Sequence, residues 1–183
     1  LFSSTSEVYG NNKKTPWKED SDRVLGDTSV DRWCYSSSKS LVEHMLYALH
    51  NSQKIKFSTV RFFNVYGPRQ SPIYVVSQTI HRLLNNKSPD LYDNGTQVRC
   101  FTYIDDAVDG MIKASTSNLA IGHAFNIGSE VQSSIKDVVN LCKNKVNKNI
   151  LINKIDTKLK YGSVYQDIDV RVPDASKAKE ILN

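Results

Sequence analysis

The sequence is poor in cysteine, and its few cysteines are scattered. Only three occur in 183 residues, at Cys34, Cys100 and Cys142, and an odd, widely spaced set fits neither a disulfide framework nor a zinc site. We therefore expect reduced thiols. The four histidines show no ligand spacing either, so the sequence predicts no metal site.

Long apolar runs are also absent. No stretch approaches the roughly 18 to 20 apolar residues that a transmembrane helix needs, and the first residues show no basic segment followed by a hydrophobic one. With 39% apolar and 23% charged residues, the composition is typical of a soluble globular protein that buries one domain-sized core. These features predict a cytosolic (cytoplasmic) protein that does not bind membranes.

No element carries a concentrated charge of one sign. The chain has 24 lysines and arginines against 19 acidic residues, a net charge of +5, and its lysines are scattered among asparagines. Nucleic-acid binding is therefore not predicted, because an anionic small substrate explains the excess of basic residues equally well.

Apolar periodicity and turn residues predict alternating strands and helices. Strands are expected at the start of the chain within residues 1–10, at Lys56 to Val65, near Leu91, at Val98 to Ile104 and at His123 to Ile127. Helices are expected at Arg32 to about Asn51, Ile73 to Asn85, Asp105 to about Ser115, Ser133 or Ser134 to about Asn147, and Asp174 through Leu182. The segment between residues 11 and 31 reads as a surface loop. This alternation indicates an α/β layer architecture with partly parallel strands.

Three of these helices have candidate capping residues. Asp105, Ser133 or Ser134, and Asp174 carry the short oxygen-bearing side chains that cap helix N-termini. The helix from Arg32 carries Leu41, Val42, Met45, Leu46 and Leu49 on one stripe, which is typical of an amphipathic helix.

The start of that helix holds a tyrosine and a lysine at a spacing that suits acid–base chemistry. Tyr35 and Lys39 are four residues apart, so on a helix they share one face. An ammonium beside a phenol favours the phenolate, which lets a tyrosine act as a general base or acid. Alone, this spacing is also compatible with an ordinary helix.

Four short segments occur in a fixed order. They are S-T-S-E-V-Y-G at 4–10, Y-S-S-S-K at 35–39, R-F-F-N-V-Y-G-P-R at 61–69 and R-V-P-D-A-S-K-A at 171–178. Together they resemble the extended short-chain dehydrogenase/reductase family that remodels nucleotide sugars, and the resemblance covers nearly the whole chain. It implies an α/β, Rossmann-type fold, of which this chain looks like the C-terminal part.

The resemblance also implies two parts. Residues 1–68 would be the remaining part of the NAD-binding Rossmann domain with the catalytic residues, and 69–183 mainly the smaller substrate-binding domain. Within the second part, 98–128 would partly return to the Rossmann sheet. Family members hold the NAD pyrophosphate on a glycine-rich turn, and this chain has no G-x-x-G-x-x-G. Its NAD site is therefore expected to be incomplete, and this polypeptide alone should bind NAD poorly.

The resemblance assigns roles to individual residues. Tyr35 would take the proton from a sugar hydroxyl while NAD takes the hydride, Lys39 would support Tyr35 and bind the nicotinamide ribose, and Thr5 would hold the sugar oxygen. Phe62 would wall the nicotinamide pocket. Ser6, Asn64 and Arg99 would contact the nucleotide sugar, Arg99 through its diphosphate.

Glu7 and Arg171 favour one reaction, decarboxylation, among those that the family catalyses. In family members that decarboxylate UDP-glucuronate, the same Thr-Ser-Glu triplet occurs and a matching arginine lies near the sugar carboxylate. Arg32-Trp33 and the segment 165–167 also resemble the decarboxylase half of the bacterial bifunctional enzyme of polymyxin resistance. The expected function is therefore NAD-dependent, transient oxidation of a UDP-sugar at C4 with decarboxylation.

Three alternatives to this function stay open. The first two are a UDP- or dTDP-hexose 4-epimerase and a 4,6-dehydratase, since some dehydratases also use a glutamate. The third is an inactive fragment that serves as a binding module or needs a separate Rossmann half. Family members pair through the helix corresponding to that from Arg32, so the resemblance also predicts a homodimer.

Overall fold

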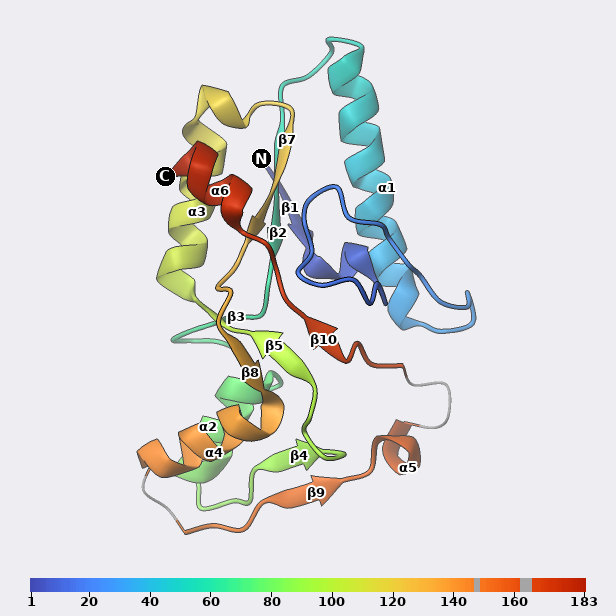
Figure 1. The fold of residues 1–183 in the computed structure, drawn as a ribbon. Coiled ribbons are helices and arrows are strands. Elements are labelled where there is room, and N and C mark those ends of the chain that lie inside the picture. The colour runs from blue at the N-terminus through green and yellow to red at the C-terminus, as the bar shows by residue number, and fades with distance from the viewer. Residues whose placement is uncertain (147–148, 162–165) are drawn as a thin grey trace.

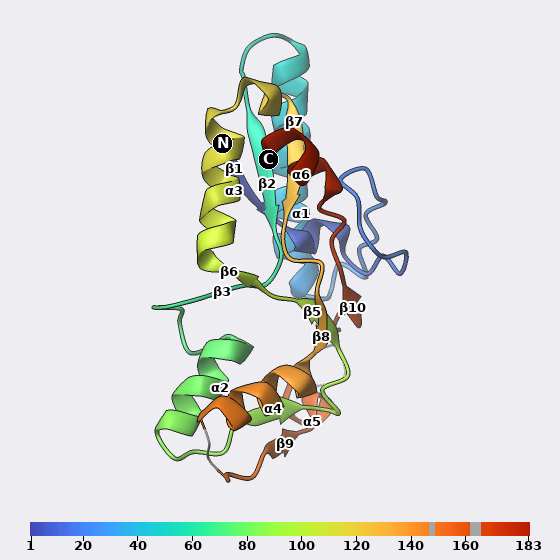
Figure 2. The ribbon, with the colours of Figure 1, turned by 60° about the vertical axis from the view of Figure 1, so that its left-hand side comes forward.

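The computed structural model describes residues 1–146, 149–161 and 166–183, and its upper part is a parallel sheet between helices. The sheet has the strand order β1-β2-β7; helix α1 covers one face, and helices α3 and α6 cover the other (Figure 1, Figure 2). The elements of this part are β1 (Phe2–Thr5), η1 (Ser6–Tyr9), α1 (Arg32–Asn51), β2 (Ser58–Phe62), α3 (Ile104–Thr116), η2 (Asn118–Ala120), β7 (His123–Ile127) and α6 (Ser176–Leu182).

The lower part of the molecule is built from smaller pieces. Strand β5 pairs with β10 and β8, strand β4 pairs with β9, and helix α2 packs against α4. The β3-β6 pair lies between the two parts (Figure 2). The elements are β3 (Val65–Tyr66), α2 (Val75–Leu84), β4 (Asp90–Tyr92), β5 (Val98–Cys100), β6 (Thr102–Tyr103), β8 (Gln132–Ser134), α4 (Ile135–Val146), β9 (Asn153–Ile155), α5 (Thr157–Tyr161) and β10 (Val170–Arg171).

The α/β class predicted from the sequence is confirmed. Strand β7 occupies one edge of the upper sheet, and α3 packs against β2 and β7. The division of the chain at residue 68 stays a prediction. Among the described residues, no helix combines the length and the apolar character needed to cross a bilayer.

Two predicted strands are shorter than expected because the backbone turns within them. Strand β2 ends at Phe62, and Asn64 follows with a positive φ of 31°, which β-strands do not adopt. The strand predicted at Val98 to Ile104 is divided into β5 and β6, and Ile104 already begins α3. By contrast, α1 and β7 have the predicted bounds.

Two of the three predicted caps need correction. The N-cap of α3 is Tyr103, without a side-chain cap, and Asp105 lies inside the first turn. The N-cap of α6 is Ala175, one residue after Asp174, although the Asp174 carboxylate still accepts a hydrogen bond from the Ser176 amide at 2.9 Å. Ser134 caps α4 as predicted, with its Oγ accepting from the Asp137 amide at 3.0 Å. That helix ends at Val146, and Asn147 lies outside the described residues.

The segment between residues 11 and 31 is not entirely superficial. Trp17 is fully buried; its ring lies 5.0 Å from that of Tyr9, and its Nε1 donates to the backbone oxygen of Asn12 at 3.1 Å. It belongs to the core cluster Val8, Tyr9, Trp17, Val30, Trp33, Phe63 and Ile168. A single aromatic residue thus anchors a segment whose polar composition predicted a surface loop.

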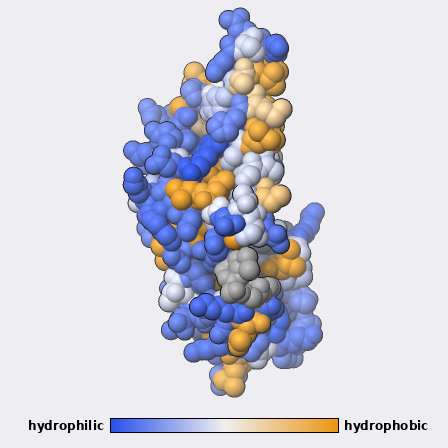
Figure 3. Space-filling model, turned by 90° about the vertical axis from the view of Figure 1, so that its right-hand side faces the viewer, coloured by the Kyte–Doolittle hydropathy of each residue, from blue (hydrophilic) through white to orange (hydrophobic). Residues whose placement is uncertain are grey.

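Helix α1 buries a polar face. Ser36, Ser40 and Glu43 are buried against the sheet, whereas Leu41 and Met45 are 61% and 54% exposed. Figure 3 views this side of the molecule and shows apolar residues among hydrophilic ones in its upper part. The predicted apolar stripe therefore does not pack α1 against the sheet. The face that does so contains Glu43, which has charged and polar partners in the interior.

Candidate active site

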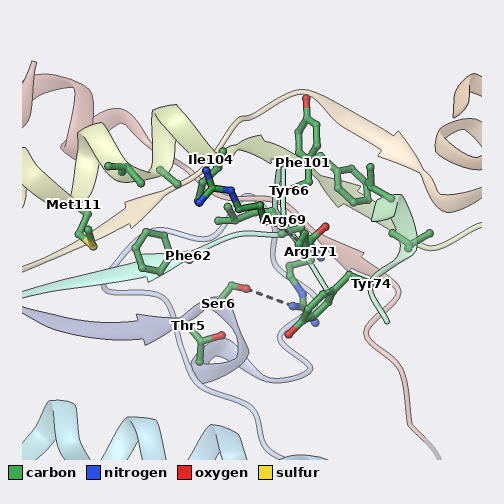
Figure 4. A pocket seen from close by; sticks show the side chains of 18 of the residues that line it. Thr5, Ser6, Phe62, Tyr66, Arg69, Tyr74, Phe101, Ile104, Met111 and Arg171 are labelled. Atoms are coloured by element: carbon green, nitrogen blue, oxygen red, sulfur yellow. Dashed lines mark hydrogen bonds between the residues drawn. The ribbon is translucent and has the colours of Figure 1, made fainter. Parts of the chain in front are cut away.

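Three parallel strands end at one edge of the sheet and place the site there. Thr5, Phe62 and Ile127 are in register across β1, β2 and β7. Parallel strands bring their carboxyl ends together, and ligands of open α/β sheets bind at that edge. A cavity of about 870 Å³ opens there (Figure 4). Its lining includes Thr5, Ser6, Glu7, Tyr35, Phe62, Asn64 and Arg171, all of which the sequence had singled out.

Tyr35 and Lys39 lie on the face of α1 that meets the end of β1. Tyr35 is 51% exposed and lines the cavity. The Lys39 ammonium lies 6.0 Å from the centre of the Tyr35 ring and donates to the backbone oxygen of Ser3 at 2.8 Å. Lys39 is therefore anchored beside the tyrosine, although it does not line the cavity in the part of the chain that the structure describes.

The Thr-Ser-Glu triplet forms the turn that follows β1. Thr5 is the N-cap of η1, and its hydroxyl accepts a hydrogen bond from the Glu7 amide at 3.2 Å. Ser6 is buried, and its Oγ accepts from Nη1 of Arg171 at 3.4 Å (Figure 4). The turn thus presents a hydroxyl at Thr5, a hydroxyl at Ser6 and a carboxylate at Glu7 to one cavity.

Glu7 is held by two arginines. Its Oε1 accepts from Arg171 Nη2 at 2.6 Å and from Arg32 Nη2 at 2.9 Å, and its Oε2 accepts from Arg32 Nε at 3.1 Å. Burial opposes ionisation of Glu7, but the charges of Arg171 and Arg32 outweigh it, so the pKa of Glu7 lies below its ordinary value. Glu7 is therefore a carboxylate at neutral pH.

Arg99 joins this cluster rather than the cavity wall. Its Nη2 donates to Asp167 Oδ1 at 3.1 Å, and the same oxygen accepts from Arg32 Nη1 at 3.2 Å. Arg99 is buried and does not line the cavity within the described ranges. Burial, reinforced by the charge of Arg171, lowers the pKa of Arg99 to about 10, which leaves it charged at neutral pH. The diphosphate contact expected for Arg99 stays a prediction.

Three buried polar atoms of cavity-lining residues have no hydrogen-bond partner among the described residues. They are Oδ1 of Asn64, Oε1 of Gln70 and Nε of Arg171. Buried polar atoms in native proteins are normally paired, so unpaired ones in a cavity wall suit the polar groups of a ligand. Two of these atoms accept and one donates, which fits a ligand with both hydroxyl and anionic groups.

Several cavity residues escaped the sequence analysis. Arg69, whose φ is 65°, lies at the end of the R-F-F-N-V-Y-G-P-R segment, which could have identified it. Tyr74 and Met111 also line the cavity, and no sequence pattern indicates either (Figure 4). Arg32 is not part of the lining but binds Glu7, which is. Its spacing of three residues from Tyr35, which places both on one helix face, could have identified it.

The cavity brings together three kinds of functional group. A phenol at Tyr35 can exchange a proton, the hydroxyl of Thr5 can hold a substrate oxygen, and the Glu7–Arg171 pair can bind or balance charge. Apolar groups from Phe62 and α3 form another wall. No group of three or more His, Cys, Asp or Glu side chains is placed to bind a metal in the part of the chain that was described.

Comparison with known proteins relates this site to nucleotide-sugar enzymes. The chain is 37% identical over 186 residues to UDP-N-acetyl-alpha-D-glucosaminuronate decarboxylase of Bacillus cytotoxicus, matching 99% of this chain and 56% of that protein. It is 32% identical to the bifunctional polymyxin resistance protein ArnA of Wigglesworthia glossinidia brevipalpis, matching 100% of this chain and 31% of that protein.

A solved structure also relates the chain to nucleotide-sugar enzymes. The UDP-glucuronic acid 4-epimerase of Bacillus cereus, in complex with UDP-glucuronic acid and NAD, superposes with a TM-score of 0.84 at 31% identity. The match covers 98% of this chain and 54% of that one. This chain thus spans about half the length of the epimerase and of the decarboxylase.

The match to the GDP-mannose 4,6 dehydratase family extends over residues 1–183. It therefore includes the triplet at Thr5, the tyrosine of α1 and the arginine of β10, the residues that meet in the cavity. The chain belongs to this family of NAD-dependent nucleotide-sugar epimerases and dehydratases.

Proposed function

We propose that this chain carries the catalytic and substrate-binding part of an NAD-dependent enzyme that decarboxylates a UDP-linked uronic acid. The observation that carries the proposal is the Glu7–Arg171 pair, which lies in the same cavity as Tyr35. A neutral hexose does not need a guanidinium at that place, whereas a uronic acid does.

Tyr35 starts the reaction in this proposal. Its phenolate removes the proton from the C4 hydroxyl of the sugar, and Thr5 holds the same oxygen by a hydrogen bond. NAD, when bound, would supply the acceptor for the hydride of C4. Lys39, anchored on Ser3 beside the Tyr35 ring, favours the phenolate and is placed to reach a ribose hydroxyl.

The oxidation makes loss of carbon dioxide possible. A ketone at C4 is β to the carboxylate on C5, so the bond from C5 to the carboxylate carbon breaks and its electron pair forms an enolate. Protonation of that enolate at C5 completes the step. Arg171 is 9% exposed at its side chain and has a buried, unpaired Nε, so it can orient the carboxylate by charge-assisted hydrogen bonds. Glu7 and Ser6 hold the other side of that guanidinium.

The residues of this chain suit the nicotinamide end of NAD. Phe62 offers an apolar wall, and Tyr35 and Lys39 lie nearby on α1. The pyrophosphate needs a glycine-rich turn that this sequence does not contain. We therefore propose that NAD binding depends on a further part like that of the longer relatives, and that the whole enzyme dimerises through the exposed stripe of α1.

A reconstituted enzyme tests the function. It joins this chain to the part of the Bacillus cereus epimerase that lies outside the match, and it receives UDP-glucuronate, UDP-glucose and UDP-N-acetylglucosamine in parallel. We expect carbon dioxide from UDP-glucuronate only. Epimerisation or dehydration of a neutral sugar without carbon dioxide would support a 4-epimerase or 4,6-dehydratase instead. No turnover of any sugar would support an inactive binding module.

A further inference from the structure

Arg32 connects three separate segments at the cavity. From the first position of α1, its Nε and Nη2 both donate to Glu7, in the turn after β1. Its Nη1 donates to Asp167 Oδ1 at 3.2 Å and to the backbone oxygen of Gln166 at 3.1 Å, in the segment that leads to β10. With 22% of its side chain exposed, it is largely fixed in this position.

Arg32 and Arg171 bind Glu7 differently. Arg32 contacts both carboxylate oxygens in the fork geometry that gives strong, directional pairs. Arg171 contacts only Oε1 and keeps an unpaired, buried Nε at the cavity. A second anion can therefore engage Arg171 while Glu7 keeps a two-point contact with Arg32.

Arg32 also shares its helix with the proposed base. Arg32, Tyr35 and Lys39 lie at positions i, i+3 and i+7 of α1, so they occupy one helix face. The helix start is anchored by Trp33, which is 3% exposed in the core. Because Arg32 and Tyr35 are both on α1, the hydrogen bonds from Arg32 to Glu7 fix Glu7 relative to Tyr35.

We propose that Arg32 is a positioning residue that holds the Glu7 carboxylate on the catalytic helix while Arg171 binds the acidic group of the substrate. This inference rests on the proposed function, because it assigns that acidic group to Arg171. Without Arg32, the substrate carboxylate and Glu7 would compete for a single guanidinium, and Glu7 would lose both its orientation and its charge partner.

The charges around Glu7 set the direction of the expected pH effect. Arg32 of α1, Arg171 of β10, Arg99 of β5 and the Asp167 carboxylate all face this cluster. Removal of Arg32 takes away one of the two cations that keep Glu7 ionised, so Glu7 should titrate at a higher pH. A nearby opposite charge typically moves such a titration by about one pH unit or more.

Three variants separate charge from geometry. Arg32→Gln removes both, Arg32→Lys keeps the charge but not the fork, and Arg82→Gln removes an arginine that pairs with Asp90 and does not line the cavity. The titration of Glu7 is followed by carbon-13 NMR in the 183-residue chain, and kcat and KM against pH are measured in the reconstituted enzyme.

We expect Arg32→Gln to raise the Glu7 midpoint by about one pH unit and to lower kcat. Arg32→Lys should restore the midpoint but keep a loss of roughly 10- to 100-fold in kcat, because misplacement of a reacting group is that costly. Arg82→Gln should match the unsubstituted protein.

An unchanged Glu7 midpoint in Arg32→Gln would overturn the inference. Full activity of Arg32→Lys would overturn the fork geometry, and Arg32→Lys also serves as the test if Arg32→Gln does not fold. Absence of carbon dioxide from the unsubstituted enzyme, with the Glu7 midpoint still raised in Arg32→Gln, would reject the decarboxylase function but not the contact between Arg32 and Glu7.

Discussion

Tyr35 stands half exposed in the first turn of α1, with Lys39 one turn further along and the cavity in front of it. In the proposed function, every chemistry considered for the chain depends on Tyr35, because oxidation of the sugar would precede epimerisation, dehydration and decarboxylation alike. Glu7 and Arg171, by contrast, distinguish one of these chemistries from the others. Substitution of Tyr35 and substitution of Glu7 or Arg171 should therefore affect activity in different ways.

The first prediction concerns Tyr35. In the reconstituted enzyme, Tyr35→Phe should reduce kcat by at least ~10²-fold, because general-base catalysis contributes that much or more. Stopped-flow absorbance of the transient NADH measures the oxidation directly. Tyr47→Phe is the matched control, since Tyr47 lies on the same helix against Phe57 and does not line the cavity. Normal NADH formation in Tyr35→Phe would show that another group removes the proton.

The second prediction concerns Arg171. Arg171→Gln should weaken kcat/KM for UDP-glucuronate by roughly 2 to 5 kcal/mol, the usual effect of truncating a desolvated charge pair. Its effect on NADH formation from UDP-glucose should be much smaller, because that sugar has no carboxylate. The two substrates are compared on one preparation of the variant. An equal loss for both would indicate that Arg171 supports the fold rather than recognising the acid.

At the scale of elements, α1 joins the site to the sheet through a buried charge. Glu43 accepts from Arg61 Nη2 at 2.6 Å and Nε at 3.1 Å, from Arg23 Nη2 at 2.8 Å and from Ser4 Oγ at 2.5 Å. Glu43 is fully buried and Arg61 is 2% exposed. The relative position of β1, β2 and α1 therefore depends on this buried charge cluster.

The third prediction follows from that pair. Glu43→Gln should lower the free energy of unfolding by about 3 to 5 kcal/mol, because it leaves the Arg61 charge buried without a counter-charge. Urea denaturation followed by circular dichroism measures this change. Asp169→Asn, which removes the exposed pair between Lys13 and Asp169, should cost less than about 1 kcal/mol. Similar losses in both variants would contradict the importance of burial.

The same carboxylate predicts a pH dependence. Burial opposes ionisation of Glu43, but the hydrogen bonds and charge of Arg61 outweigh it, so its pKa is lower in the folded chain than its ordinary value of about 4.3. Its contribution to stability is therefore complete above that value and is lost as the pH falls through the folded pKa. Urea midpoints between pH 7 and pH 3 should fall less steeply in Glu43→Gln than in the unsubstituted chain.

The outer face of α1 gives the fourth prediction. Leu41→Glu should shift a homodimer toward monomer in sedimentation velocity while leaving the melting temperature nearly unchanged, because this side chain is 61% exposed in the single chain. Leu119→Glu is the control, since Leu119 is 70% exposed in η2, which packs against α3 and α6 rather than α1. A purely monomeric profile of the unsubstituted chain at all concentrations would contradict pairing through α1.

The elements that the sequence predicted well are those with strong local patterns. The bounds of α1 and β7 follow from helical periodicity and a compact apolar run, and Phe62, Asn64 and residues 65–69 of the R-F-F-N-V-Y-G-P-R segment line the cavity. Local patterns could not predict the ion cluster, because Arg32 and Asp167 meet across 135 residues. They could not predict the inward face of α1 either, since the buried Glu43 is paired with Arg61, which comes from strand β2.

At the scale of the whole molecule, the chain spans about half the length of the decarboxylase and of the epimerase that it matches. Its sheet has β1 at one edge, next to the Thr-Ser-Glu turn, and β7 at the other. The residues suited to NAD lie around the end of β1. What the chain does on its own therefore depends on how much of NAD these residues alone can bind.

The fifth prediction is that the 183-residue chain alone has little affinity for NAD. Titration calorimetry of the 183-residue chain with NAD should give no measurable heat at micromolar concentrations, because the sequence has no glycine-rich turn for the pyrophosphate. The reconstituted enzyme serves as the positive control. A micromolar dissociation constant for the chain alone would require a pyrophosphate site elsewhere in it.

The register of β1 against β2 has a consequence for how faithfully the chain must fold. Ser4 points to Glu43 beneath the sheet, and the next residue, Thr5, borders the cavity. Alternate residues of a strand face opposite sides, so a slip of one residue would exchange these two environments. The threonine would leave the substrate and the buried glutamate would lose a partner in the same event. A chain with this register error would lose the hydrogen bond from Ser4 to Glu43 as well as the position of Thr5 at the cavity. The buried charge therefore disfavours folded chains in which Thr5 is misplaced.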